Sequence, residues 1–161
     1  MTVSEYNDSV TLYSDAVYRF VLKNVKDEEK ARDIVQDSYE KLWRNHEKVS
    51  GLKVRSYLFA VAYHTLIDVV RRNTKQGDWE KVTTQQLGYE NHYSDLNEIL
   101  HQAIDRLPES QKMVLMLRDY EGYSYQEISE ITQLTEAQVK VYIFRARVFL
   151  KSYIGRIDAV V

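Results

Sequence analysis

The chain has 161 residues, of which 44% are hydrophobic and 29% charged, so it can bury a core and keep a charged surface. It contains no cysteine, which excludes disulfides, thiolate zinc sites and cysteine nucleophiles. The net charge of −2 gives no support for nucleic-acid binding. The polar N-terminal segment 1–10 does not resemble a signal peptide, and the sequence has no apolar run of about 18 residues, so we expect no membrane insertion.

Three stretches in the first half of the chain show helical periodicity. Apolar residues recur every three or four positions over 9–23, 28–45 and 54–72, and one proline and five glycines in the whole chain also favour helices. Over 28–45 the apolar positions fit one face of a helix, the stripe that we expect to be buried: Ala31, Ile34, Val35, Leu42 and Trp43. In the first stretch we expect four residues to face inward: Leu12, Val17, Phe20 and Val21.

The periodicity stops between Asn73 and Ser94. This segment is polar, contains Gly77 and Gly88, and is longer than most loops within a compact domain. It predicts a linker between two helical units. A long surface loop within a single domain is the alternative.

Helical periodicity returns at 95–107 and 113–117, separated by Pro108. Ser124 with Glu127 forms a capping box that begins a short helix, and Thr135 is a good N-cap for a longer one. The longer helix has an apolar seam at Val139, Ile143, Ala146 and Leu150. A short helix, a tight turn and a longer helix predict a helix-turn-helix, whose second helix lies in the DNA major groove.

The residues left outside that seam are the candidate DNA contacts. They are Ala137, Gln138, Lys140, Val141, Phe144, Arg145, Arg147 and Lys151. We expect Gln138, Lys140 and Val141 to meet base edges because they lie near the helix N-terminus, and the later basic residues to meet phosphates. Basic residues are concentrated over 138–156 and 48–75, whereas most acidic residues lie elsewhere. A plain helical hairpin with a solvated basic face is the alternative.

The motifs over 107–112, 117–129, 139–140 and 145–147 resemble the C-terminal promoter-binding domain of extracytoplasmic-function (ECF) sigma factors of the sigma-70 family. The resemblance implies binding to the minus-thirty-five promoter element. In the turn this chain has Thr132 and Gln133 where the family usually has leucine and glycine. The glycine commonly takes a positive φ, so we expect strain at Gln133.

The N-terminal part resembles the same family independently. Residues 31–43 are similar to its polymerase-binding helix, with Asp33, Gln36, Asp37 and Glu40 outside the buried stripe. An acidic face suits a basic partner. The alternative interpretation is that these four side chains form an ordinary solvated helix face without a partner.

Residues 57–72 are similar to the family's promoter-melting segment, in which aromatic side chains stack on unpaired bases and arginines hold phosphates. The resemblance implies six candidate contacts to the minus-ten element: Arg55, Tyr57, Tyr63, His64, Arg71 and Arg72. The family usually has arginine and asparagine where Tyr63 and His64 stand. Tyr57 and Phe59 are alternatively core residues.

The resemblance implies an all-α chain of two small helical domains: region 2 over 1–75, a flexible linker over 76–94, and region 4 over 95–161. The expected function is transcription initiation in the cytoplasm, with core RNA polymerase and promoter DNA as partners. The resemblance also implies an anti-sigma factor as a partner, because sigma factors of this class are often held inactive by one. We expect no cofactor, metal or catalytic residue. A two-lobed regulator that does not use the polymerase is one alternative. An enzyme is another, although no two of the four histidines are spaced four residues apart.

Overall fold

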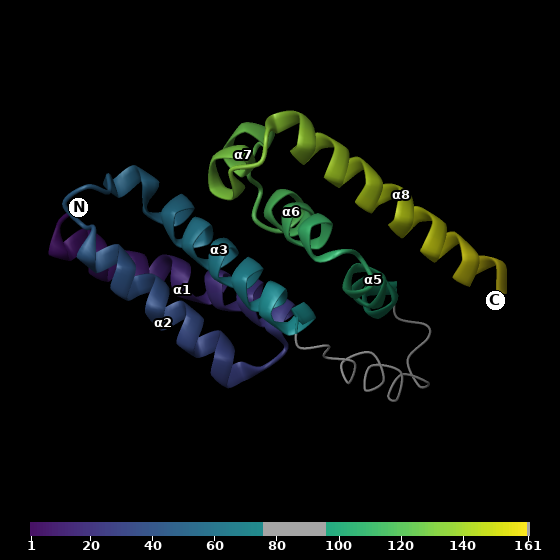
Figure 1. Cartoon of the computed structure of the whole chain (residues 1–161), viewed down its shortest axis with the longest axis horizontal. Helices are drawn as coiled ribbons and strands as arrows, with labels where there is room; N and C mark the ends of the chain where they lie inside the picture. The colour runs from purple at the N-terminus through teal and green to yellow at the C-terminus, as the bar shows by residue number, and fades with distance from the viewer. Residues whose placement is uncertain (76–95, 161) are drawn as a thin grey trace.

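The computed structural model describes residues 1–75 and 96–160, and the predicted linker over 76–94 lies outside these residues. All regular structure in the described part is helical, in agreement with the all-α prediction (Figure 1). The elements are α1 (Val3–Val25), α2 (Glu28–Arg44), the short 3-10 helix η1 (Gly51–Lys53), α3 (Val54–Lys75), α5 (Leu96–Asp105), α6 (Glu109–Asp119), α7 (Tyr125–Thr132) and α8 (Glu136–Val160). We call α1–α3 the N-terminal lobe and α5–α8 the C-terminal lobe.

Side-chain caps define the helix ends of the N-terminal lobe. Thr2 and Glu5 form a capping box at the start of α1, and the carboxylate of Asp27 caps α2. Val17, Phe20 and Val21 are buried as predicted, but Leu12 is exposed. The buried positions of α1 include Ser9 and Val17, so Leu12 falls on the neighbouring face.

The C-terminal lobe is built around α6, whose residues 112–117 are all buried. The helix-turn-helix follows, with the predicted capping box of Ser124 and Glu127 at the start of α7. Gln133 closes α7 with φ of 66°, so the chain places glutamine at a left-handed position where glycine is favoured. In α8 the predicted seam packs inward: Val139, Ile143 and Ala146 are buried and Leu150 is partly buried.

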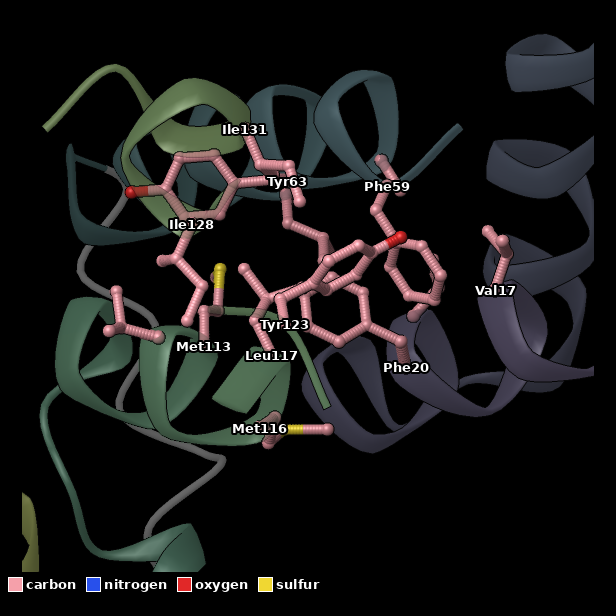
Figure 2. Packing of buried hydrophobic residues seen from close by; sticks show 14 of the residues in the cluster. Val17, Phe20, Phe59, Tyr63, Met113, Met116, Leu117, Tyr123, Ile128 and Ile131 are labelled. Atoms are coloured by element: carbon pink, nitrogen blue, oxygen red, sulfur yellow. The ribbon is translucent and has the colours of Figure 1, made fainter. Parts of the chain in front are cut away.

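The two lobes pack against each other through an apolar core. Figure 2 shows Phe20 and Phe59 from the N-terminal lobe facing Met116, Leu117 and Tyr123 from the C-terminal lobe. The Phe59 ring lies 5.5 Å from that of Phe20 and 5.7 Å from that of Tyr123, both in edge-to-face geometry. Each lobe therefore covers part of the apolar surface of the other.

A buried lysine joins the lobes at one side of this core. Lys112 on α6 is only 2% exposed, and its Nζ donates a 3.0 Å hydrogen bond to the carbonyl oxygen of Lys23 near the end of α1. The same Nζ lies 3.2 Å from Asp105, which also pairs with Lys23 and Lys26. Burial lowers the pKa of Lys112, although Asp105 opposes this effect. The ammonium group of Lys112 in the C-terminal lobe thus provides a hydrogen-bond donor to a free carbonyl oxygen at the C-terminal end of α1, in the N-terminal lobe.

Arg55 makes the second polar connection between the lobes. Its Nη2 donates to the carbonyl oxygen of Glu121 at 2.9 Å and lies 3.3 Å from the carboxylate of the same residue. The guanidinium also lies over the Tyr123 ring, 4.4 Å from its centre. Arg55 therefore binds the C-terminal lobe through charge, a hydrogen bond and an aromatic contact together.

Candidate nucleic-acid and polymerase interfaces

Helix α8 presents its predicted DNA-contacting residues to solvent. All eight candidates are exposed: Ala137, Gln138, Lys140, Val141, Phe144, Arg145, Arg147 and Lys151. They are exposed because the opposite face of the helix packs on α5, α6 and α7. The surface combines basic and apolar side chains, and it can meet both phosphates and base edges.

Hydrogen bonds and ion pairs within the lobe determine which groups of the first turns of α8 remain available to DNA. The Oε1 atom of Gln138 accepts from the backbone nitrogen of Thr135 at 2.9 Å and from its hydroxyl at 3.2 Å, which closes a capping box around the helix start. The amide NH2 of Gln138 is thus the group directed to a partner, and it donates. Lys140 pairs with Glu136 at 3.9 Å, and Arg147 pairs with Asp119 at 2.8 Å. Such exposed pairs are weak enough for phosphates to replace them.

Helix α2 presents the predicted polymerase-binding face. Asp33, Gln36, Asp37 and Glu40 are all exposed, while Ala31, Ile34, Ser38 and Leu42 on the opposite face are buried. None of the three carboxylates forms an ion pair within the described ranges 1–75 and 96–160. This acidic face is therefore available to a basic partner.

Trp43 extends this face beyond the predicted residues. It is partly exposed, stacks on His46 at 4.3 Å between ring centres, and meets Tyr6 edge-to-face at 5.1 Å. A cavity of about 520 Å³ lies beside it, lined also by Val3 and Glu40. The sequence pattern assigned Trp43 to the buried stripe, which was wrong because the ring lies at the rim of the α1–α2 contact.

The predicted melting residues on α3 divide into two groups. His64, Arg71 and Arg72 are exposed, whereas Tyr57 is partly buried and its hydroxyl accepts a 3.0 Å hydrogen bond from Asn45. Tyr63 is only 5% exposed, and Figure 2 places it among the buried residues between the lobes. The C-terminal lobe covers the Tyr63 ring in this conformation, so stacking of Tyr63 on a base requires the lobes to separate and stays a prediction.

Arg55 is also engaged rather than free, through its contacts with Glu121 and Tyr123. Phe59 is completely buried, which confirms the alternative that it is a core residue. A cavity of about 560 Å³ lies beside Tyr57, between the 45–53 segment and α7, with Lys48 and Lys53 in its lining. No sequence motif marks this cavity, because residues from both lobes form it.

The part of the chain that the structure describes contains no group of three or more histidine, cysteine, aspartate or glutamate residues arranged to hold a metal ion. Among the same residues, no helix is both long and apolar enough to cross a membrane.

Comparisons with known proteins agree with this arrangement. The family description "Sigma-70 region 2" matches residues 10–76, and "Sigma-70, region 4" matches residues 97–150. The chain is 31% identical to the RNA polymerase sigma factor SigV of Bacillus subtilis, over 92% of this chain and 90% of SigV. It is 29% identical to the ECF RNA polymerase sigma factor SigM of the same organism, over 97% of each chain.

A solved structure shares the fold. The sigma factor RpoE, in a complex with the anti-sigma factor NepR from Bartonella quintana, superposes with a TM-score of 0.74 at 21% identity. The match covers 95% of this chain and 98% of that one. The helical architecture, the two matched regions and the full-length similarity to SigV together show that this chain belongs to the extracytoplasmic-function group of the sigma-70 family, whose members direct promoter recognition in transcription initiation.

Proposed function

We propose that this sigma factor divides its work among three surfaces. The acidic face of α2 binds core RNA polymerase, the outward face of α8 binds the minus-thirty-five element as duplex, and the exposed end of α3 holds the opened minus-ten strand. The observation that carries the proposal is the exposure of all eight predicted DNA contacts on α8, beside a helix-turn-helix with its seam buried. The protein acts in the cytoplasm as a binding factor and not as an enzyme.

The lobes separate when the protein engages a promoter. Tyr63 and Arg55, both expected to face DNA, are held between the lobes by Ile131, Tyr123 and Glu121. Base stacking needs an open ring face, so these residues can contribute only after the C-terminal lobe moves away. Until then, His64, Arg71 and Arg72 are the accessible contacts on α3.

Run-off transcription with core polymerase on a genomic library tests the function, with and without the protein. The polymerase-binding face is tested by Asp37→Lys, which reverses one exposed charge on α2. We expect weaker binding to core polymerase with unchanged helicity. The matched control is Asp15→Lys, the same charge reversal at an exposed position in the middle of α1. Equal affinity of the two variants for core polymerase contradicts this assignment.

An anti-sigma factor is a further proposed partner. The structural relative RpoE is described in a complex with one.

A further inference from the structure

A cavity of about 680 Å³ lies between the lobes, on the side where Lys112 reaches α1. Its walls come mainly from the C-terminal part of α1 and from α5 and α6, so the cavity is complete only while the lobes are packed. Small-molecule sites typically have volumes of about 300–1,000 Å³ and often lie at domain interfaces. None of the residues proposed above to contact polymerase or DNA lines this cavity.

The wall of the cavity carries an excess of positive charge. Three ammonium groups surround the carboxylate of Asp105, those of Lys23, Lys26 and Lys112 at 3.8, 3.2 and 3.2 Å. Desolvation acts to raise the pKa of Asp105, but the charges of the three lysines outweigh it and lower the pKa, so the carboxylate is ionised at neutral pH. One carboxylate balances only one of these cations, and the cluster therefore keeps a net positive charge.

Arg19 of α1 adds a further cation to the lining of the cavity. It forms no ion pair with any other residue that the structure describes. Burial raises the pKa of the Glu121 carboxyl, and Arg55 and Arg19 oppose this effect, but it is Arg55 that pairs with Glu121, at 3.3 Å. Glu28, the remaining carboxylate in the lining, lies in the first turn of α2, where the helix dipole stabilises it. The guanidinium of Arg19 is thus available to bind an anion.

The rest of the lining is largely apolar. Phe20 and Leu22 contribute from α1, and Met116 and Tyr120 contribute from the C-terminal lobe. Figure 2 shows Met116 extending from α6 toward the helix that carries Phe20. Tyr120 is 47% exposed, so part of its ring is open to a ligand. A ligand that fills this cavity therefore needs an apolar body, and a flat one can stack on the tyrosine ring.

We propose that this cavity binds a small organic anion, with a carboxylate group held by Arg19 and an aromatic body packed against Leu22 and Tyr120. The planar guanidinium matches a carboxylate with two parallel hydrogen bonds. His101 of α5 also lines the cavity and can donate a hydrogen bond from the C-terminal lobe. Inorganic phosphate does not fit, since it leaves the apolar walls without a contact. A cationic ligand does not fit, since the lysines around Asp105 repel it.

A ligand in this cavity stabilises the packed lobes, because both lobes contribute to its binding site. At a ligand concentration 100 times its dissociation constant, the ratio of packed to separated molecules rises about 100-fold. If promoter binding needs separated lobes, as proposed above, the ligand lowers the affinity for the promoter. This consequence rests on the proposed function, whereas the binding site itself does not.

NMR titration of the full 15N-labelled chain with 2-naphthoate tests the site in the absence of DNA and polymerase. We expect the amide signals of 19–26 in α1 and of 116–121 in the C-terminal lobe to shift together. The neutral analogue 2-naphthylmethanol should bind at least about tenfold more weakly, and inorganic phosphate should leave these signals unchanged. Arg19→Gln should weaken the binding of 2-naphthoate by about tenfold or more, and Tyr120→Ala should also weaken it.

Arg32→Gln is the matched control, because Arg32 is an exposed arginine of the same lobe that does not line the cavity. The remaining signals of each variant report whether the fold is retained. Absence of any shift, shifts confined to one lobe, equal binding of the neutral analogue, or unchanged affinity in Arg19→Gln overturns the proposal. Anisotropy with promoter duplex, with and without 2-naphthoate, tests the consequence separately. If 2-naphthoate binds as expected and promoter affinity does not change, the binding site is supported and the proposed separation of the lobes is contradicted.

Discussion

Helices α8 and α3 carry the two predicted DNA surfaces, and the structure leaves the first fully exposed and covers part of the second. The candidate contacts on α8 are all exposed, because its buried seam faces its own lobe. Tyr63 and Phe59 of α3 lie under the C-terminal lobe in the shared core, whereas His64, Arg71 and Arg72 are exposed. Exposure that depends on packing within one lobe can be predicted from helical periodicity. Exposure that depends on the other lobe cannot, because the contacting residues are distant in sequence.

The largest expected effect is a loss of stability when the contact between the lobes, which covers part of α3, is disrupted at Lys112. Lys112→Glu replaces the buried ammonium with a carboxylate beside Asp105 and the carbonyl oxygen of Lys23. Breaking a buried charge pair in this way costs about 3–5 kcal/mol. We expect a loss of this size in the free energy of unfolding, measured with denaturant, and a larger radius of gyration in solution scattering. Lys151→Glu on the exposed face of α8 is the control, and equal stability of the two variants would show that the lobes do not depend on Lys112.

Tyr63→Ala tests whether this ring is a core residue or a base-stacking residue. Removing a buried aromatic side chain leaves a cavity, so we expect a loss of about 3 kcal/mol in the free energy of unfolding without any DNA present. His64→Ala removes an exposed neighbouring ring and should change the stability little. If Tyr63→Ala retains full stability and only promoter opening is impaired, the ring is not part of the shared core in solution.

Arg145→Ala should affect duplex DNA binding more than His64→Ala does. Arg145 is exposed on α8 and is proposed to neutralise one phosphate, so its loss should lower the slope of log affinity against log salt by about one. The measurement is fluorescence anisotropy with promoter duplex at several salt concentrations. An equal loss in His64→Ala would place duplex binding on both lobes and remove the contrast between α8 and α3.

The smallest effect at neutral pH is expected for Tyr123 between the lobes. Burial raises the pKa of its hydroxyl to about 12, against about 10 when unfolded. The neutral form is thus favoured in the folded chain, so the associated stability is complete below pH 10 and is lost as the pH rises from 10 to 12. Denaturation at pH 8 and pH 11 should show a smaller decline in Tyr123→Phe than in the unsubstituted chain. A decline of equal size in both would mean that Tyr123 does not contribute to the alkaline loss.

Sequence patterns predicted the features that depend on neighbours a few residues apart. The capping box of Ser124 and Glu127, the buried seam of α8 and the positive φ of Gln133 were all confirmed. The patterns did not indicate that Tyr63 is buried, because the residues that cover it lie on α7, more than sixty positions later. They also failed for Leu12 and Trp43, whose exposure depends on how α1 and α2 meet. The cavity beside Tyr57 combines both lobes and has no local signature.

The contact between the lobes sets the fraction of molecules that are open, and in our proposal only these molecules can bind a promoter. If only separated lobes engage the promoter, the apparent dissociation constant equals the intrinsic one divided by the fraction of open molecules. Each 1.4 kcal/mol of contact between the lobes then weakens apparent affinity about tenfold. Substitutions at Phe59 and Lys112, whose side chains are buried between the lobes, are therefore expected to shift the protein concentration at which transcription begins.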